Sequence, residues 1–167
     1  YLLADLLLDA VERSDPDRAK LLEEAADCLR NMTALGLSGP RRARITGRIA
    51  LAQGKVPEAV EELESAFNGF GGQDVKVANL LISIYLRQKL PGKADAVLDK
   101  LLSIPGQLRN VSVLMAKARL LIRYRDFDKA DRIITRVLQL EPDNAEAVST
   151  KTMIQVVRGE APLFSGK

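Results

Sequence analysis

The sequence has no histidine, no tryptophan and a single cysteine, Cys28, and these absences narrow its chemistry. Histidine is the commonest general base near neutral pH and a frequent metal ligand, and a zinc site needs several Cys or His side chains. One cysteine also excludes a disulfide within the chain. We therefore expect no catalysis, no metal and no cofactor.

Aromatic residues and long apolar runs are scarce as well. Phe, Trp and Tyr make up 4% of the chain, which leaves few of the stacking platforms that nucleic-acid binders use. No segment approaches the roughly 20 apolar residues that cross a bilayer. We expect no nucleic-acid partner and no membrane insertion of this segment. The chain opens at Tyr1, and we expect a piece of a longer protein whose compartment, cytoplasmic or bacterial periplasmic, stays open.

Charge is present but unevenly spread. The net charge is +3, yet residues 1–39 hold eight acidic and four basic side chains, so the basic excess lies in the rest of the chain. This asymmetry indicates an acidic partner for the later part. With 47% hydrophobic residues over 167 positions, the chain is large enough for one domain with a sizeable core.

An apolar pattern recurs four times. Each copy has an alanine just after a helix-start signal, and successive alanines are 40, 35 and 36 residues apart: Ala19, Ala59, Ala94 and Ala130. In the last three copies, apolar residues stand four and seven positions after the alanine, which places them on one helix face. The first copy has Glu23 in this stripe, a weaker pattern that fits a terminal repeat.

Signals for helix ends accompany these copies. Pro16, Pro57 and Pro91 precede three of the alanines, where a missing N–H costs nothing, and Asp15 and Asp126 are placed to cap a first helical turn. Another amphipathic stretch precedes each copy. Short turns join the two stretches at 54–55, 89–90 and 125–126. Turns this short force antiparallel helices, so the predicted fold class is all-α.

These features resemble the tetratricopeptide repeat family over nearly the whole chain. The closest unit, 111–144, fills the family's consensus positions with Leu114, Ala118, Leu121, Phe127, Ala130, Ile134, Val137 and Pro142, although the family's usual Trp is absent. The resemblance implies a right-handed α-solenoid of antiparallel helix pairs. One domain is expected over 1–158, with repeats at about 1–39, 40–74, 75–110 and 111–144, a partial repeat at 145–158 and a tail at 159–167. Helix-pair repeats of other families stay an alternative.

The resemblance also implies a function. One helix pair cannot bury its apolar face alone, so stacked pairs share a core, and in this family the first helix of each pair lines a concave groove. The predicted partner-binding residues there are Arg44, Arg48, Lys76, Asn79, Ser83, Arg87, Met115, Arg119 and Arg123. Guanidinium groups bind carboxylates through paired hydrogen bonds. We therefore expect a scaffold that binds another protein through an acidic or extended peptide segment.

The basic residues and the repeat also allow alternatives. Charged helix residues are mostly solvated, so the arginines need not form a site. The clamp that some family members use for chaperone carboxyl termini is expected to be absent, because Arg48 and Leu80 stand where that clamp has Asn. The alternative functions are self-assembly by end-to-end stacking, which would make the chain a homo-oligomer, and binding of an acidic polymer such as polysaccharide in a larger bacterial export scaffold.

Overall fold

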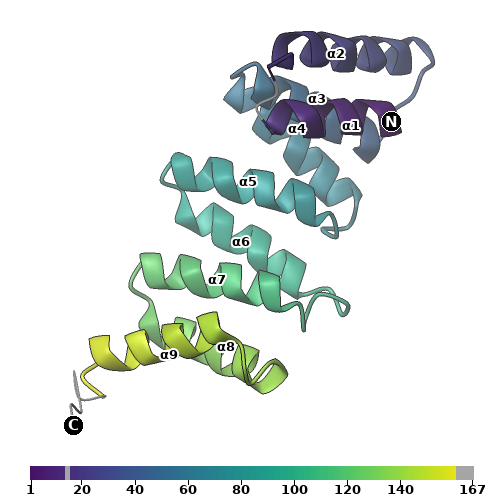
Figure 1. Cartoon of the computed structure of the whole chain (residues 1–167). Helices are drawn as coiled ribbons and strands as arrows, with labels where there is room; N and C mark the ends of the chain where they lie inside the picture. The colour runs from purple at the N-terminus through teal and green to yellow at the C-terminus, as the bar shows by residue number, and fades with distance from the viewer. Residues whose placement is uncertain (14–15, 161–167) are drawn as a thin grey trace. The chain divides into compact units, whose positions relative to one another are not determined.

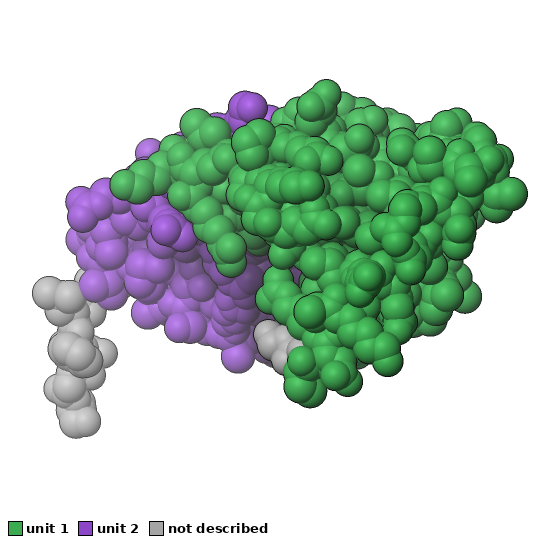
Figure 2. Space-filling model, turned by 90° about the horizontal axis from the view of Figure 1, so that it is seen from above, with its two compact units in different colours: residues 1–90 green, residues 91–167 purple. Residues whose placement is uncertain are grey.

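The computed structural model describes residues 1–13 and 16–160. The regular secondary structure in those ranges consists of α-helices alone. The cap predicted at Asp15 and residues 161–167 of the predicted tail lie outside the described residues. Contacts divide the chain into two compact units, Tyr1–Leu90 and Pro91–Lys167, which Figure 2 colours separately. The single domain over 1–158 stays a prediction.

Each unit is a stack of antiparallel helices. Unit 1 contains α1 (Leu2–Glu12), α2 (Arg18–Ala34), α3 (Pro40–Ala52), α4 (Val56–Gly69) and α5 (Val75–Arg87). Unit 2 contains α6 (Pro91–Leu102), α7 (Val111–Arg123), α8 (Phe127–Leu140) and α9 (Ala145–Val157). Within each unit, consecutive helices pack in chain order, and α1 also contacts α3 (Figure 1). These bounds confirm the predicted all-α fold class.

Side-chain caps begin four of the helices. Asp74, Asn110 and Asn144 each accept a hydrogen bond from the backbone N–H three residues later, at the starts of α5, α7 and α9. Asp126 does the same at the start of α8. Each cap contributes about 1 kcal/mol. Of these four caps, the sequence pattern predicts only the one at Asp126.

The turns within three helix pairs share one backbone conformation. Gly54, Lys89 and Arg125 follow α3, α5 and α7 and have φ angles of 78°, 59° and 61°. The N–H of the next residue donates in each case to the carbonyl oxygen five residues before it, at 2.8–2.9 Å, as in a Schellman motif. The motif ends each of these three first helices, which confirms the predicted short turns.

The predicted alanine stripe is correct in three repeats and wrong in the first. Ala59, Ala94 and Ala130 are fully buried, whereas Ala19 is exposed. The reason is that α2 has 17 residues, so Ala19 lies on its first turn, and the buried small residue of this helix is Ala25. From Ala25 to Ala59 the spacing is 34 residues, close to the 35 and 36 residues of the following repeats.

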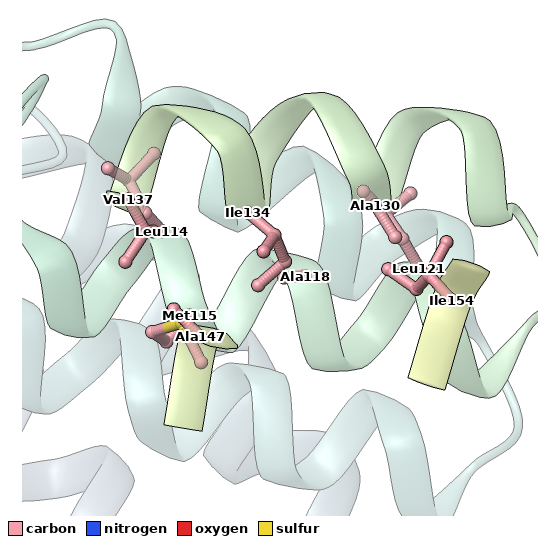
Figure 3. Packing of buried hydrophobic residues seen from close by; sticks show 9 residues of the cluster. All are labelled: Leu114, Met115, Ala118, Leu121, Ala130, Ile134, Val137, Ala147 and Ile154. Atoms are coloured by element: carbon pink, nitrogen blue, oxygen red, sulfur yellow. The ribbon is translucent and has the colours of Figure 1, made fainter. Parts of the chain in front are cut away.

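The core of unit 2 lies between α7, α8 and α9. Figure 3 shows three α8 side chains spaced along the helix and facing the side chains of α7. The cluster consists of Leu114, Met115, Ala118, Leu121, Ala130, Ile134, Val137, Ala147 and Ile154. Burial of the larger aliphatic side chains contributes roughly 1.5–3 kcal/mol each. Six of the eight consensus residues noted in the sequence belong to this core, Phe127 packs against it, and Pro142 is exposed.

Unit 1 has its closest helix contact between α3 and α4. Gly47 of α3 lies against Leu63 of α4, and a Cβ atom at Gly47 would come within 2.8 Å of the Leu63 Cγ. Leu63 is fully buried. The missing side chain therefore lets the two helices approach closely at this point.

Candidate functional site

Arg48 of α3 is bound by the chain's own acidic residues. Its side chain is 5% exposed, and it donates hydrogen bonds to Glu12 Oε1 at 2.9 Å, Asp5 Oδ1 at 3.1 Å and Asp9 Oδ1 at 2.6 Å. The three acceptors follow one another at helical spacing and so share one face of α1. The acidic partner of this arginine is α1.

The charges in this network stabilise one another. Burial opposes ionisation of Arg48, but its hydrogen bonds to Asp9 and Glu12 and the charge of Glu12 outweigh burial and raise its pKa. Partial burial of Asp9 raises its pKa, but the hydrogen bonds and charges of Arg48 and Lys76 lower it by more. The pKa of Asp9 therefore lies below its usual value. Both groups are therefore charged at neutral pH.

Arg44 extends the network along α3. It pairs with Asp5 of α1 and donates to Asp74 Oδ2 at 2.9 Å, and its guanidinium carbon lies 5.6 Å from the ring centre of Phe70. The Arg44 side chain is 22% exposed. Since Asp74 also caps α5, the two arginines of α3 tie the start of α5 and one face of α1 to the same helix.

Beside Arg48, unit 1 has a hollow in two adjoining parts, which we call the unit 1 hollow. The larger part has a volume of about 340 Å³ and the smaller about 270 Å³. Both parts are bordered by Glu12, Arg48, Leu80 and Ser83. The larger part adds Val11, Arg18, Leu51, Ala52, Ile84 and Arg87, and the smaller part adds Asp9, Lys76 and Asn79.

The hollow brings together five of the predicted site residues: Arg48, Lys76, Asn79, Ser83 and Arg87. Arg87 is exposed and forms no ion pair with any residue in the described ranges. Lys76 has a side chain that is 74% exposed, and its Nζ lies 3.2 Å from Asp9 Oδ2. Arg44 lies outside the hollow walls. The positive charge that faces solvent here comes from Arg87, Lys76 and the exposed Arg18.

The predicted site residues of unit 2 lie in different surroundings. Met115 is 4% exposed and belongs to the core cluster, so its side chain is not available to a partner. Arg119 forms a bidentate pair with Glu146 of α9, with both N–O distances 2.7 Å, and its side chain is 60% exposed. Arg123 is exposed on the last turn of α7.

Lysines of α7 and α9 occupy equivalent repeat positions. Lys117 is 6% exposed and its Nζ lies 2.7 Å from Asp95 Oδ1 and 2.6 Å from Asp99 Oδ1, both on α6. Lys151 of α9 reaches α8 at the matching positions, Asp131 and Thr135. The lysines join each first helix to the preceding second helix. A hollow of unit 2 that is bordered by Asp95, Asp99 and Lys117 therefore belongs to a structural joint.

Sequence reasoning missed the acidic face of α1 and the lining residue Arg18. The signal for the acidic face is present in the sequence: Asp5, Asp9 and Glu12 have i, i+4, i+7 spacing, and they account for part of the acidic excess of residues 1–39. Their partner is 36–43 residues away, and only the stacking of α1 on α3 brings the two together.

Two general features of the described residues bear on the site. Within 1–13 and 16–160, no three His, Cys, Asp or Glu side chains are grouped so that they could hold a metal ion. None of the helices in this part of the chain combines the length and apolarity needed to cross a membrane.

Comparison with known proteins gives matches to solved structures. No family model matches the sequence, and no curated protein matches it. A tetratricopeptide repeat protein from Parabacteroides merdae is 21% identical, with a TM-score of 0.68 over 94% of this chain and 59% of that chain. MamA from AMB-1 is 19% identical, with a TM-score of 0.65 over 95% of this chain and 82% of its own.

A third match was solved with a ligand. The first TPR domain of Spaghetti (RPAP3), bound to the HSP90 peptide SRMEEVD, is 19% identical, with a TM-score of 0.55 over 72% of this chain and 96% of that domain. At these identities the likeness concerns the fold. The helix pairs, their turns and these neighbours together show that the chain has the tetratricopeptide repeat fold.

Proposed function

We propose that the chain is a non-catalytic protein-interaction scaffold that binds an acidic or extended peptide segment of another protein. The observation that carries this proposal is the unit 1 hollow, which combines an apolar floor with the exposed cations Arg18 and Arg87. A structural neighbour, the Spaghetti domain, binds a peptide with acidic residues. The proposed surface keeps Lys76, Asn79, Ser83 and Arg87 of the predicted site and leaves out Met115.

The proposal assigns different roles to the predicted arginines. Arg48 forms part of the wall of the surface and Arg44 lies outside it, and the guanidinium groups of both are already bound by carboxylates of α1 or by Asp74. Arg87 is available to a ligand. In unit 2, Arg119 and Arg123 are exposed, and we propose them as a separate contact surface of that unit. Guanidinium groups on such surfaces are frequent interface anchors.

The test is binding of fluorescein-labelled acidic and neutral peptides to the whole chain, followed by fluorescence anisotropy at low and high salt. We expect the acidic peptide to bind and Arg87→Glu to weaken binding about tenfold, the effect of losing one charge-assisted contact. Arg30→Glu is the matched control, because Arg30 is an exposed arginine on α2 outside the hollow. Binding that ignores both salt and Arg87→Glu would contradict the proposal.

Self-assembly is a second candidate, favoured by one exposed apolar face. Leu2, Leu3 and Leu6 of α1 are 75%, 60% and 57% exposed, and such patches often mark association surfaces. In contrast, α9 has Val148, Thr152 and Gln155 where α7 has the core residues Leu114, Ala118 and Leu121. The two polar residues, Thr152 and Gln155, reduce the apolar area available for head-to-tail stacking. Light scattering is the test, and a monomer at high concentration would contradict self-assembly.

A further inference from the structure

The unit 1 hollow is cationic at one end only. The larger part is bordered by Arg18 and Arg87, each exposed, and by Glu12 with Arg48, which form a pair. In the smaller part the charges balance, because Asp9 and Glu12 face Arg48 and Lys76. Among the described residues Arg18 and Arg87 form no ion pair, so a ligand carboxylate meets a net positive charge in the larger part and balanced charges in the smaller part.

Arg48 does not add to the attraction. Its Nε donates to Glu12, its Nη1 to Asp5 and its Nη2 to Asp9, at 2.9, 3.1 and 2.6 Å. A ligand carboxylate that approached Arg48 would displace one of these acceptors and would lie close to the other two. Repulsion between the ligand carboxylate and the carboxylates already present is a common basis of specificity against a wrong ligand.

The floor of the larger part is apolar. Leu51, Leu80 and Ile84 line it, together with the two arginines and Glu12 of α1. Ile84 is 5% exposed, so the floor is part of the packed unit and is formed before any ligand arrives. An aliphatic side chain that enters this part loses contact with water and gains contact with the three floor side chains.

From this charge pattern we infer that the unit 1 hollow selects a segment with one carboxylate directly beside an aliphatic residue, and that further acidic residues in the segment add no affinity. The inference rests on the proposed peptide-binding function and narrows its ligand. The carboxylate pairs with Arg87 or Arg18, the aliphatic side chain covers the floor, and any further carboxylate falls beside Asp9 and Glu12. Affinity therefore depends on the arrangement of charge and not on its total.

The test uses three labelled peptides of equal length in a Gly/Ser background. The first contains a leucine followed by one aspartate, the second has alanine in place of that leucine, and the third has a leucine followed by a run of aspartates. We expect the first peptide to bind about tenfold more tightly than the second, the effect of one buried aliphatic side chain. We expect the third to bind no more tightly than the first at low salt.

A variant of the acidic face sharpens the result. Glu12→Gln removes one repelling charge from the border of both parts while keeping a hydrogen-bond acceptor for Arg48. It should strengthen binding of the acidic-run peptide by up to about fivefold, as expected for one partly exposed charge. Binding of the single-aspartate peptide should change less. Circular dichroism of the variant shows whether the helices are retained.

Each outcome separates the inference from the function it rests on. If none of the peptides binds, the proposed function is contradicted for this surface. If the acidic-run peptide binds more tightly than the single-aspartate peptide and Glu12→Gln changes nothing, the selectivity is overturned while peptide binding stands. If leucine and alanine peptides bind equally, the floor has no role and the inference is also overturned.

Discussion

Units 1 and 2 join successive helix pairs with different charged side chains. In unit 1, arginines of α3 bind the acidic face of α1 and the cap residue of α5, so the contacts run between first helices. In unit 2 the exposed Arg119–Glu146 pair also joins two first helices, but the less exposed Lys117 and Lys151 bind the preceding second helices. One repeat pattern therefore accommodates two ways of satisfying charge at the joint between pairs.

The difference shows how the same repeat position serves two purposes. Arg48 and Arg119 stand at the same place in their helices, six residues before the turn residues Gly54 and Arg125. The side chain of Arg48 is 5% exposed and that of Arg119 is 60% exposed. This position on the first helix is thus buried against three carboxylates in unit 1, whereas in unit 2 it forms one exposed pair with Glu146.

The largest expected effect comes from removing the buried arginine. Arg48→Ala leaves Asp5, Asp9 and Glu12 close together without their counter-charge, and we expect a loss of about 3 kcal/mol in the free energy of unfolding. Arg119→Ala is the matched control and should cost less than about 1 kcal/mol, because its pair is exposed. Urea denaturation followed by circular dichroism measures both. Equal losses of unfolding free energy in the two variants would contradict the difference between the units.

The lysine joints of unit 2 give the next largest effect. Lys117→Ala should cost about 2 kcal/mol, because the side chain is buried and two aspartates lose their partner. Lys151→Ala should cost about half as much, since the Lys151 side chain is 26% exposed. Lys117→Met keeps the apolar stem and should recover part of the loss. A larger loss for Lys151 than for Lys117 would show that burial does not set the strength of these joints.

The helix contact of unit 1 offers a smaller test. Gly47→Ala places a Cβ 2.8 Å from Leu63 Cγ, and overpacking of this kind costs about 1–3 kcal/mol, which exceeds the gain of about 1 kcal/mol from the better helix former. The corresponding residue of α7 is Ala118, where Ala118→Gly should also destabilise. Thermal unfolding of both variants is the measurement. A more stable Gly47→Ala variant would mean that α3 and α4 separate without cost.

The smallest effect is the pH dependence of the α1 joint. Because the pKa of Asp9 is lowered in the folded chain, its contribution is fully present above the unfolded pKa of about 3.9. That contribution is lost as the pH falls through the lower, folded pKa. Stability of the wild type should therefore drop on acidification below about pH 4 more than that of Asp9→Asn. Urea midpoints in a pH series compare the two, and identical slopes would remove Asp9 from the joint.

Much of the fold follows from the sequence by local rules. The turns at Gly54 and Arg125, the stripe of Ala130, Ile134 and Val137, and the cap at Asp126 each depend on residues a few positions apart. The error at Ala19 has the same origin, because the start signals before it locate the beginning of α2 but do not say which turn of this long helix meets α3.

The site is less predictable because its charges are satisfied over long distances. The sequence places Arg48 on the exposed face of a first helix, and nothing within its own helix indicates three carboxylates from α1. The charge asymmetry between residues 1–39 and the rest predicts an external acidic partner, whereas α1 supplies that partner to Arg44 and Arg48. Met115 shows the same limit, since the packing of α9 decides its burial.

The central claim, that the arginines of α3 hold unit 1 together, is tested most directly by a double-mutant cycle. The variants Arg48→Met, Asp9→Asn and their combination are unfolded in urea, and the cycle of Arg119→Met with Glu146→Gln serves as reference. We predict a coupling energy of about 1 kcal/mol or more for the first pair and less than about 0.5 kcal/mol for the second. A first coupling near zero would contradict the account.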